Sequence, residues 1–188
     1  MKKINYIILK IIIIFKLLSM VIAICPATNE TVDVNLKELS GGWYVTAATP
    51  VTGQVGKCLY FEIEKSENNE FIMNFTSTSY RNNQRIWWDV RGFQNGKILM
   101  AKWRLSTSAK PIGPFQHQVV AINHDEYIAI IVCATDTKHI TKGQVALILS
   151  RQKILPPTIL INLKTIMAKY VDRNDILDID NTCDGITI

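Results

Sequence analysis

Short runs of alternating apolar and polar residues fill the middle of the chain, and turn-forming residues separate them. Links such as Gln94-Asn95-Gly96 are too short for anything but antiparallel hairpins between consecutive runs. We therefore expect an all-β, up-and-down antiparallel meander, which the strand spacing allows to close as a barrel or to pack as a sandwich. The eight predicted strands cover residues 43–49, 58–65, 70–78, 85–92, 97–105, 115–123, 126–134 and 144–150.

Alternation within the predicted strands separates an inner face from an outer one, because successive side chains of a strand point in opposite directions. Charged residues such as Glu62, Asp89 and Arg91 are expected in solvent, and Cys58 shares the outer face with Glu62. The opposite face is apolar and aromatic. The predicted inward side chains include Leu59, Phe61, Ile63, Phe71, Met73, Phe75, Trp88, Val90, Leu99, Ala101 and Trp103, with His117 in the sixth strand.

The last two predicted strands are apolar on both faces, so another element must cover their outside. Apolar residues recur at three- and four-residue steps after Pro156-Pro157, which predicts an amphipathic helix at about 157–170 that packs there. The acidic segment 171–188 is expected to be an extended, irregular tail. Prolines in 106–114 argue against sheet pairing in that segment.

The N-terminal segment 1–23 has two early lysines, an Ile- and Leu-rich stretch and small residues at its end, which is typical of a removable signal peptide. Lys10 and Lys16 interrupt it, so it lacks the ~20 apolar residues of a membrane span. Its removal leaves 17 basic against 16 acidic residues, so the mature chain is nearly neutral and shows no basic cluster for nucleic acid. Residues 24–188 suit one domain.

The four cysteines are Cys25, Cys58, Cys133 and Cys183, an even number in a chain expected to be secreted, extracellular and oxidised. Two disulfides are expected, and four cysteines allow three pairings. The three histidines are scattered, so no metal site is expected. Asn29 and Asn74 begin glycosylation sequons, and Asn181-Thr182-Cys183 is a poorer one.

Three segments together resemble the lipocalin family over the mature chain. Gly41-Gly42-Trp43 is similar to the family's G-x-W motif at the start of the first strand, Asp125-Glu126-Tyr127 to its T-D-Y region, and Ser150-Arg151 to the arginine after the eighth strand. The resemblance implies an eight-stranded up-and-down barrel at about 41–151 with one C-terminal helix outside. It also implies that Arg151 packs on Trp43 and closes one end.

The cysteine positions resemble those of insect-type lipocalins, the group of insecticyanin, bilin-binding protein and apolipoprotein D-like proteins. That resemblance implies the pairs Cys25–Cys133 and Cys58–Cys183, while Cys25–Cys58 stays open as an alternative. It also implies a carrier or sequestering protein for a small hydrophobic ligand, with a bilin such as biliverdin as the leading example. The barrel-interior candidates are Phe61, Met73, Phe75, Trp88, Val90, Leu99, Trp103 and His117.

Three other functions compete with this one. One is the scavenging of haem or an amine. Haem ligation would use His117, but the fourth predicted strand has no histidine to match the haem-binding branch of the family. A protein partner, as in salivary or venom inhibitors, would bind the loops 51–57 and 106–114. An enzyme of the prostaglandin-synthase type needs a free thiolate, and all four cysteines are expected in disulfides. We therefore expect no catalytic residue.

Overall fold

The structure is a computed structural model that describes residues 25–27, 29–50, 56–64, 69–80, 82–134 and 143–183. The predicted signal peptide and most of the loop 51–57 lie outside the described residues. The described strands are β1 (Gly41–Ala48), β2 (Lys57–Glu64), β3 (Glu70–Thr78), β4 (Arg85–Asn95), β5 (Ile98–Arg104), β6 (Ile112–Asn123), β7 (Tyr127–Cys133), β8 (Gln144–Ser150) and β9 (Leu177–Asp178). The described helices are α2 (Leu36–Leu39), α3 (Pro157–Met167) and the 3₁₀ helix η1 (Arg173–Asp175).

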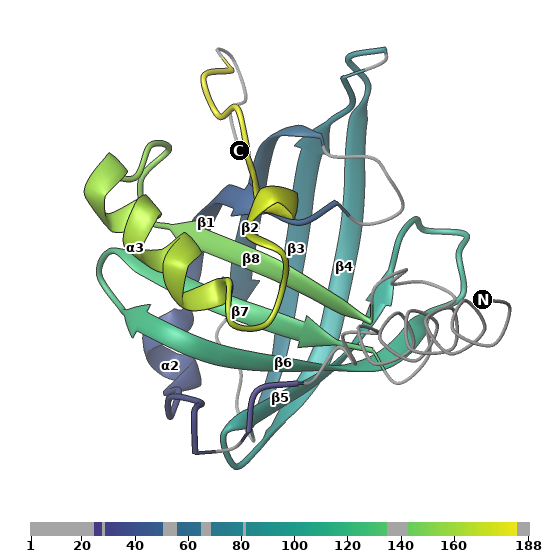
Figure 1. Ribbon diagram of the computed structural model, residues 1–188. Coiled ribbons are helices and arrows are strands. Elements are labelled where there is room, and N and C mark those ends of the chain that lie inside the picture. The colour runs from purple at the N-terminus through teal and green to yellow at the C-terminus, as the bar shows by residue number, and fades with distance from the viewer. Residues whose placement is uncertain are drawn as a thin grey trace, which may run out of the picture.

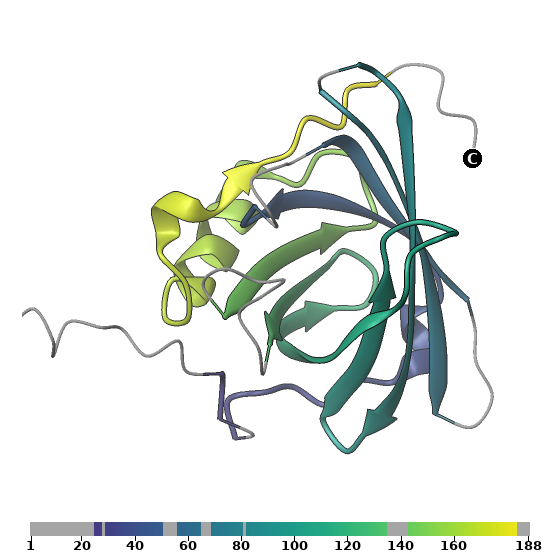
Figure 2. The same cartoon turned by 90° about the vertical axis from the view of Figure 1, so that its right-hand side faces the viewer.

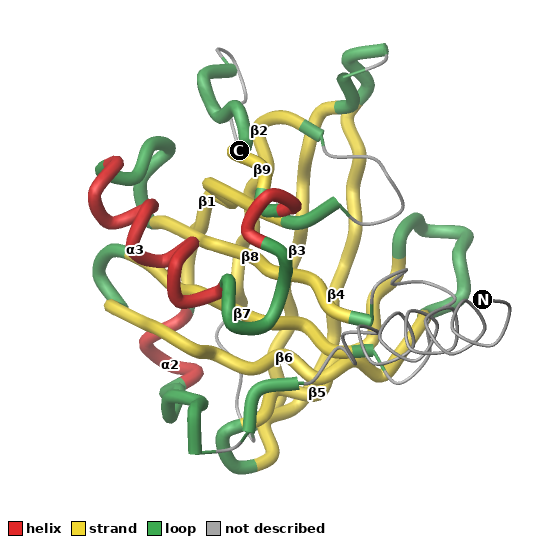
Figure 3. The backbone as a smooth tube through the Cα atoms, viewed as in Figure 1, coloured by secondary structure: helices red, strands yellow, loops and turns green. Residues whose placement is uncertain are grey.

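Strands β1 to β8 form one closed antiparallel barrel, as Figures 1 and 3 show. Each strand pairs with the next along the chain, and β1 pairs with both β8 and β2, which closes the ring. The eight-stranded barrel is thus confirmed, and each predicted strand overlaps an observed one. The barrel wall gives the molecule an inner face and an outer face with separate apolar clusters.

Helix α3 covers the outer face of the barrel, as predicted (Figure 2). Pro157 occupies its first turn, where the absent proline N–H costs no hydrogen bond. Leu163 and Met167 point from the helix onto the doubly apolar strands β7 and β8 and are 2% and 0% exposed. The helix ends at Met167, three residues before the predicted end, and residues 168–170 form a turn.

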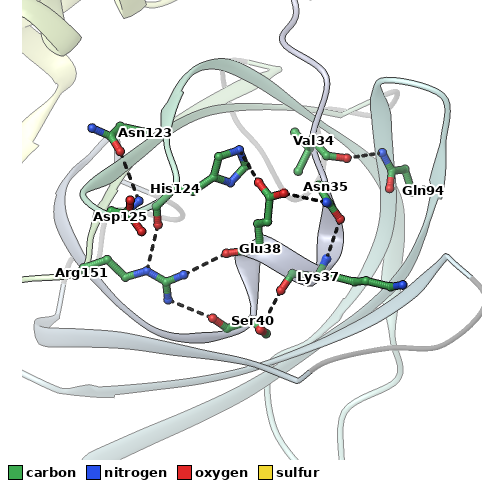
Figure 4. Close-up of polar contacts among 10 residues, drawn as sticks. All are labelled: Val34, Asn35, Lys37, Glu38, Ser40, Gln94, Asn123, His124, Asp125 and Arg151. Atoms are coloured by element: carbon green, nitrogen blue, oxygen red, sulfur yellow. Dashed lines mark hydrogen bonds and ion pairs between the residues drawn. The ribbon is translucent and has the colours of Figure 1, made fainter.

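One end of the barrel is closed by α2 and by side chains around Arg151 (Figure 4). The guanidinium carbon of Arg151 lies 3.6 Å from the ring centre of Trp43. Its nitrogens donate to the carbonyl oxygens of Glu38, Ser40, Gly42 and His124 at 3.0–3.2 Å. The arginine thus joins α2, the start of β1 and the turn before β7, as the resemblance implied.

Neighbouring residues complete this closed end. The indole N–H of Trp43 donates to the Leu39 carbonyl oxygen at 2.8 Å, and Trp43 is fully buried. Gly41 has φ +90°, a backbone conformation that is strained for any residue with a side chain. A Cβ added at Gly41 would lie 3.4 Å from a guanidinium nitrogen of Arg151. Asp125 lies in the turn before β7, and Tyr127 begins that strand.

The C-terminal segment is more ordered than its sequence predicts, and this corrects the expected irregular tail. After η1, strand β9 pairs with Ala47 and Ala48 of β1. Further on, the Ile179 N–H donates to the Thr46 carbonyl oxygen at 3.0 Å, and the Cys58 N–H donates to that of Asp180 at 2.8 Å. The tail therefore fills the seam where β1 and β2 diverge, and it places Ile179 in the inner cluster.

Two further expectations are corrected. The Asp89 side chain is on the outer face but only 2% exposed, because Arg91 and Arg104 bind its two oxygens at 2.9 and 2.5 Å. Strand β6 begins at Ile112, which pairs with Trp103, so the proline segment enters the sheet through a register shift. Cys58 is 7% exposed at a register irregularity, where its φ is +56° and its disulfide partner is Cys183 of the tail.

Disulfides join Cys25 to Cys133 and Cys58 to Cys183, the pairs that the insect-type resemblance implied. The first ties the N-terminal segment to the end of β7, and the second ties the tail to the start of β2. Among the residues that the structure describes, no helix is long and apolar enough to cross a membrane.

Candidate ligand-binding site

A cavity of about 360 Å³ lies inside the barrel, toward the end opposite α2. Strand β1 runs away from α2. Its last residue Ala48 and the following Thr49 line the cavity, as does Gly56 just before β2. Tyr80, which is 55% exposed, marks the rim. The lining residues are Val45, Ala48, Thr49, Gly56, Leu59, Phe61, Met73, Phe75, Ser77, Ser79, Tyr80, Ile86, Trp88, Val90, Trp103, His117, Ile130, Val145 and Leu147.

Aromatic rings from three neighbouring strands form one wall of the cavity. The ring centres of Phe61 and Phe75 are 4.7 Å apart, and those of Phe75 and Trp88 are 4.5 Å apart. These distances are typical of favourable aromatic pairs, so the rings hold one another in place. The strand pairing brings these rings together. Phe61 of β2 is the pairing partner of Phe75 in β3, and Phe75 is also the pairing partner of Trp88 in β4.

Strand β3 carries a gradient of polarity along the cavity. Its inward side chains change from Phe71 near the closed end through Met73 and Phe75 to Ser77 at the rim. Phe71 belongs to the packed inner cluster, while the other three line the cavity. The deep part of the cavity is therefore apolar, and hydroxyl groups occur near its opening.

His117 is buried at the cavity wall, and both of its ring nitrogens are engaged. Nε2 accepts a hydrogen bond from the indole N–H of Trp103 at 3.0 Å, and Nδ1 lies 3.2 Å from the Phe115 carbonyl oxygen. Nδ1 therefore carries the proton. Burial lowers the pKa of His117 to about 4. The backbone contacts with Phe115 and Leu99 raise this pKa, but by less than burial lowers it. The imidazole is neutral at pH 7, and Trp103 occupies the lone pair that a haem iron would need.

Most of the predicted interior residues meet in this cavity. Phe61, Met73, Phe75, Trp88, Val90, Trp103 and His117 all line it. Leu99 does not line the cavity. It is 4% exposed within the inner cluster, where it lies opposite His117 in the pairing of β5 with β6. The expectation that Leu99 contacts a ligand is corrected, because its part of the barrel is filled with side chains.

Sequence reasoning also missed several lining residues. Ser77 has the same parity as Phe71, Met73 and Phe75, so alternation alone could have placed it there. Val145 and Leu147 belong to a strand that is apolar on both faces, so alternation could not choose between them and Ala146. Val45 and Ala48 both line the cavity despite opposite parity, because a register shift interrupts β1 between Val45 and Ala47.

The described lining is mostly apolar. None of the lining side chains is Asp, Glu, Lys or Arg, and no group of three or more His, Cys, Asp or Glu among the described residues could hold a metal ion. The cysteine thiols are all in disulfides. The lining can enclose an apolar molecule and offer hydroxyl groups at the rim.

Comparison with known proteins gives likenesses of structure only. No protein-family model matches the sequence, and no curated protein does. Insecticyanin from the tobacco hornworm Manduca sexta superposes with a TM-score of 0.63 at 18% identity, over 84% of this chain and 86% of that one. The amine-binding protein of Rhodnius prolixus, in its tryptamine complex, gives 0.64 at 14% identity, over 82% and 85%.

A crustacean protein gives the same result. Lobster apocrustacyanin A1 superposes with a TM-score of 0.60 at 15% identity, over 78% of this chain and 79% of that one. The likenesses span most of every chain compared. Together with the Trp43–Arg151 closure, they show that this chain has the lipocalin fold, in the form shared by insect and crustacean lipocalins.

Proposed function

We propose that the protein is a secreted carrier or sequestering protein that binds one small hydrophobic ligand inside the barrel and does not transform it. The observation that carries the proposal is the cavity of about 360 Å³ with its wall of Phe61, Phe75 and Trp88. Rigid aromatic walls offer a large contact area at little cost in side-chain entropy. Proteins of this fold include the insecticyanin and amine-binding proteins compared above.

The size of the cavity favours a compact ligand. Its volume of about 360 Å³ lies in the lower part of the ~300–1,000 Å³ range of small-molecule pockets. One or two fused rings fit this space better than the four linked rings of biliverdin. An absorbance spectrum of protein purified from its natural source tests the bilin alternative, which predicts a coloured protein.

A fluorescence titration with N-phenyl-1-naphthylamine, an uncharged apolar probe, tests the proposal. We expect a saturable increase in emission that Ala48→Phe weakens at least tenfold, because the larger side chain occupies the cavity. Asn162→Phe places the same aromatic side chain on the exposed face of α3 and should leave the titration unchanged. Equal binding by both variants, or no saturable binding to the unmodified protein, would contradict the proposal.

Secretion and glycosylation belong to the same proposal. Two disulfides suit an oxidising compartment, and segment 1–23 has the pattern of a signal peptide. Asn29 is exposed, and Asn74 is partly exposed on the outer face of β3, where its amide donates to Glu64 at 2.6 Å. Asn181 is 4% exposed and its amide donates to Val45, so we expect no glycan there. Mass spectrometry of secreted protein tests all three positions.

A further inference from the structure

Among the described residues, the cavity lining provides no side chain that would pair with a charged ligand. None of its described lining residues is Asp, Glu, Lys or Arg. An ionised group that leaves water without a counter-ion loses far more free energy than a hydroxyl or carbonyl does, even where backbone dipoles compensate in part. A ligand that places an ammonium or carboxylate group in this cavity is therefore disfavoured.

His117 cannot act as the counter-ion. Its Nδ1–H is directed to the Phe115 carbonyl oxygen, and its Nε2 accepts from Trp103. A second proton on Nε2 would face the Trp103 N–H directly, so a positive imidazolium would lose that hydrogen bond. The hydrogen-bonding capacity of both residues is consumed within the wall, which leaves apolar ring surface toward the cavity.

Ser77 offers a hydrogen bond near the rim. Its side chain is 4% exposed and lines the cavity, and within the described part of the chain its hydroxyl has no hydrogen-bond partner. Gly56 leaves room beside it, because a Cβ at that position would come within 3.0 Å of the Ser77 Oγ. A hydroxyl both donates and accepts, so it suits an uncharged hydroxyl or carbonyl group.

Resting on the carrier function proposed above, we propose that the cavity selects uncharged ligands of one or two rings that carry a single hydroxyl or carbonyl group. The rings lie against Phe61, Phe75 and Trp88, and the polar group reaches Ser77 toward the rim. The ligand thus follows the polarity gradient of β3. Charged molecules of the same size and shape are rejected because the described wall has no group to compensate them.

Three two-ring compounds of similar size isolate the effect of charge. Tryptophol carries a hydroxyl, tryptamine an ammonium and indole-3-acetate a carboxylate at pH 7.4, and all three share the indole ring. By isothermal titration calorimetry we expect tryptophol to bind at least tenfold more tightly than either ion. Tryptamine is the sharpest comparison, since it is the ligand in the Rhodnius prolixus complex with the same fold.

Variants of β3 test the position of the polar group. Ser77→Ala should weaken tryptophol binding about threefold to tenfold, the range for one lost neutral hydrogen bond. Thr76→Ala removes a hydroxyl from the neighbouring outward-facing position and should leave binding unchanged. Ser77→Asp should raise the affinity for tryptamine above that of the unmodified protein. A gain of binding of this kind cannot result from misfolding.

Each outcome bears on one proposal or the other. Preferential binding of tryptophol with the expected response at Ser77 supports the inference. Tighter or equal binding of either ion overturns it and leaves the carrier function in place. Binding of N-phenyl-1-naphthylamine with no binding of the three indoles overturns the ligand class. No binding of N-phenyl-1-naphthylamine overturns the carrier function, and the inference falls with it.

Discussion

Two buried polar residues, His117 and Asp89, have their hydrogen-bonding groups engaged by near neighbours in this barrel. His117 lies in the cavity wall with Trp103 and Phe115 as hydrogen-bond partners, and Asp89 lies on the outer face between Arg91 and Arg104. Burial opposes ionisation of Asp89, but the hydrogen bonds from Arg104 and Arg91 hold its pKa below the ordinary value. His117 has no such charged partner, so burial alone decides its state and keeps it neutral.

This difference predicts a loss of stability in acid. The pKa of His117 is about 4 in the folded protein, against about 6.5 when unfolded. Between these values the unfolded chain binds more protons, so the free energy of unfolding falls as pH drops from 6.5 to 4, by roughly 3 kcal/mol in all. Urea titrations should show a smaller loss for His117→Gln. Parallel curves for the two proteins would contradict the prediction.

Among the elements, α3 and the tail act as an outer layer on the barrel. Strands β7 and β8 are apolar on both sides, so they are stable in water only when something covers the outer side. The helix does this with one face, and Lys164 continues the attachment by binding Asp178 of β9 at 2.7 Å. The opposite helix face is exposed, with Ile161 53% accessible.

Two truncations on the two faces of α3 test this arrangement. Met167→Ala should lower the free energy of unfolding by about 2–5 kcal/mol, because it leaves a hole in a fully buried contact with β7 and β8. Ile161→Ala removes an exposed side chain and should change the free energy by less than about 0.5 kcal/mol. Chemical denaturation of both variants gives the comparison. Similar values for both would show that the helix is not a required cover.

For the whole molecule, the two disulfides fasten the N-terminal segment and the C-terminal tail to the barrel. Cys25–Cys133 spans 108 residues and Cys58–Cys183 spans 125, so each restricts the unfolded chain over most of its length. The second also fixes the tail in the seam between β1 and β2, beside the cavity-lining residues Val45 and Ala48. Stability and cavity shape are therefore connected through this one bridge.

Replacing each pair of cysteines by serine separates the two effects. Either double variant should lose about 4–5 kcal/mol of stability in denaturant titrations, less any strain that is released. Only Cys58→Ser/Cys183→Ser should speed hydrogen exchange at the backbone amides of positions 179 and 58, which donate hydrogen bonds across the seam. The Cys25→Ser/Cys133→Ser variant is the matched control. Equal protection of the seam in both variants would contradict the role given to the second disulfide.

The barrel, the outer helix and the aromatic interior were predictable because each depends on a local pattern. Alternation in β2, β3 and β4 reflects strand geometry, and the three- and four-residue steps of α3 reflect helix geometry. The cavity wall Phe61–Phe75–Trp88 follows once these strands are in register. The cysteine pairing came from resemblance, since spacing alone allowed three patterns.

Only the tertiary structure decided the features that depend on contacts between distant segments. A register shift in β1 breaks the alternation, so the presence of both Val45 and Ala48 in the cavity wall depends on packing around the whole ring. The tail becomes a strand only because β1 and β2 diverge beside it. Leu99 and Trp103 share one strand face, yet only Trp103 lines the cavity, since the depth of side-chain filling is a property of the closed barrel and of no single strand.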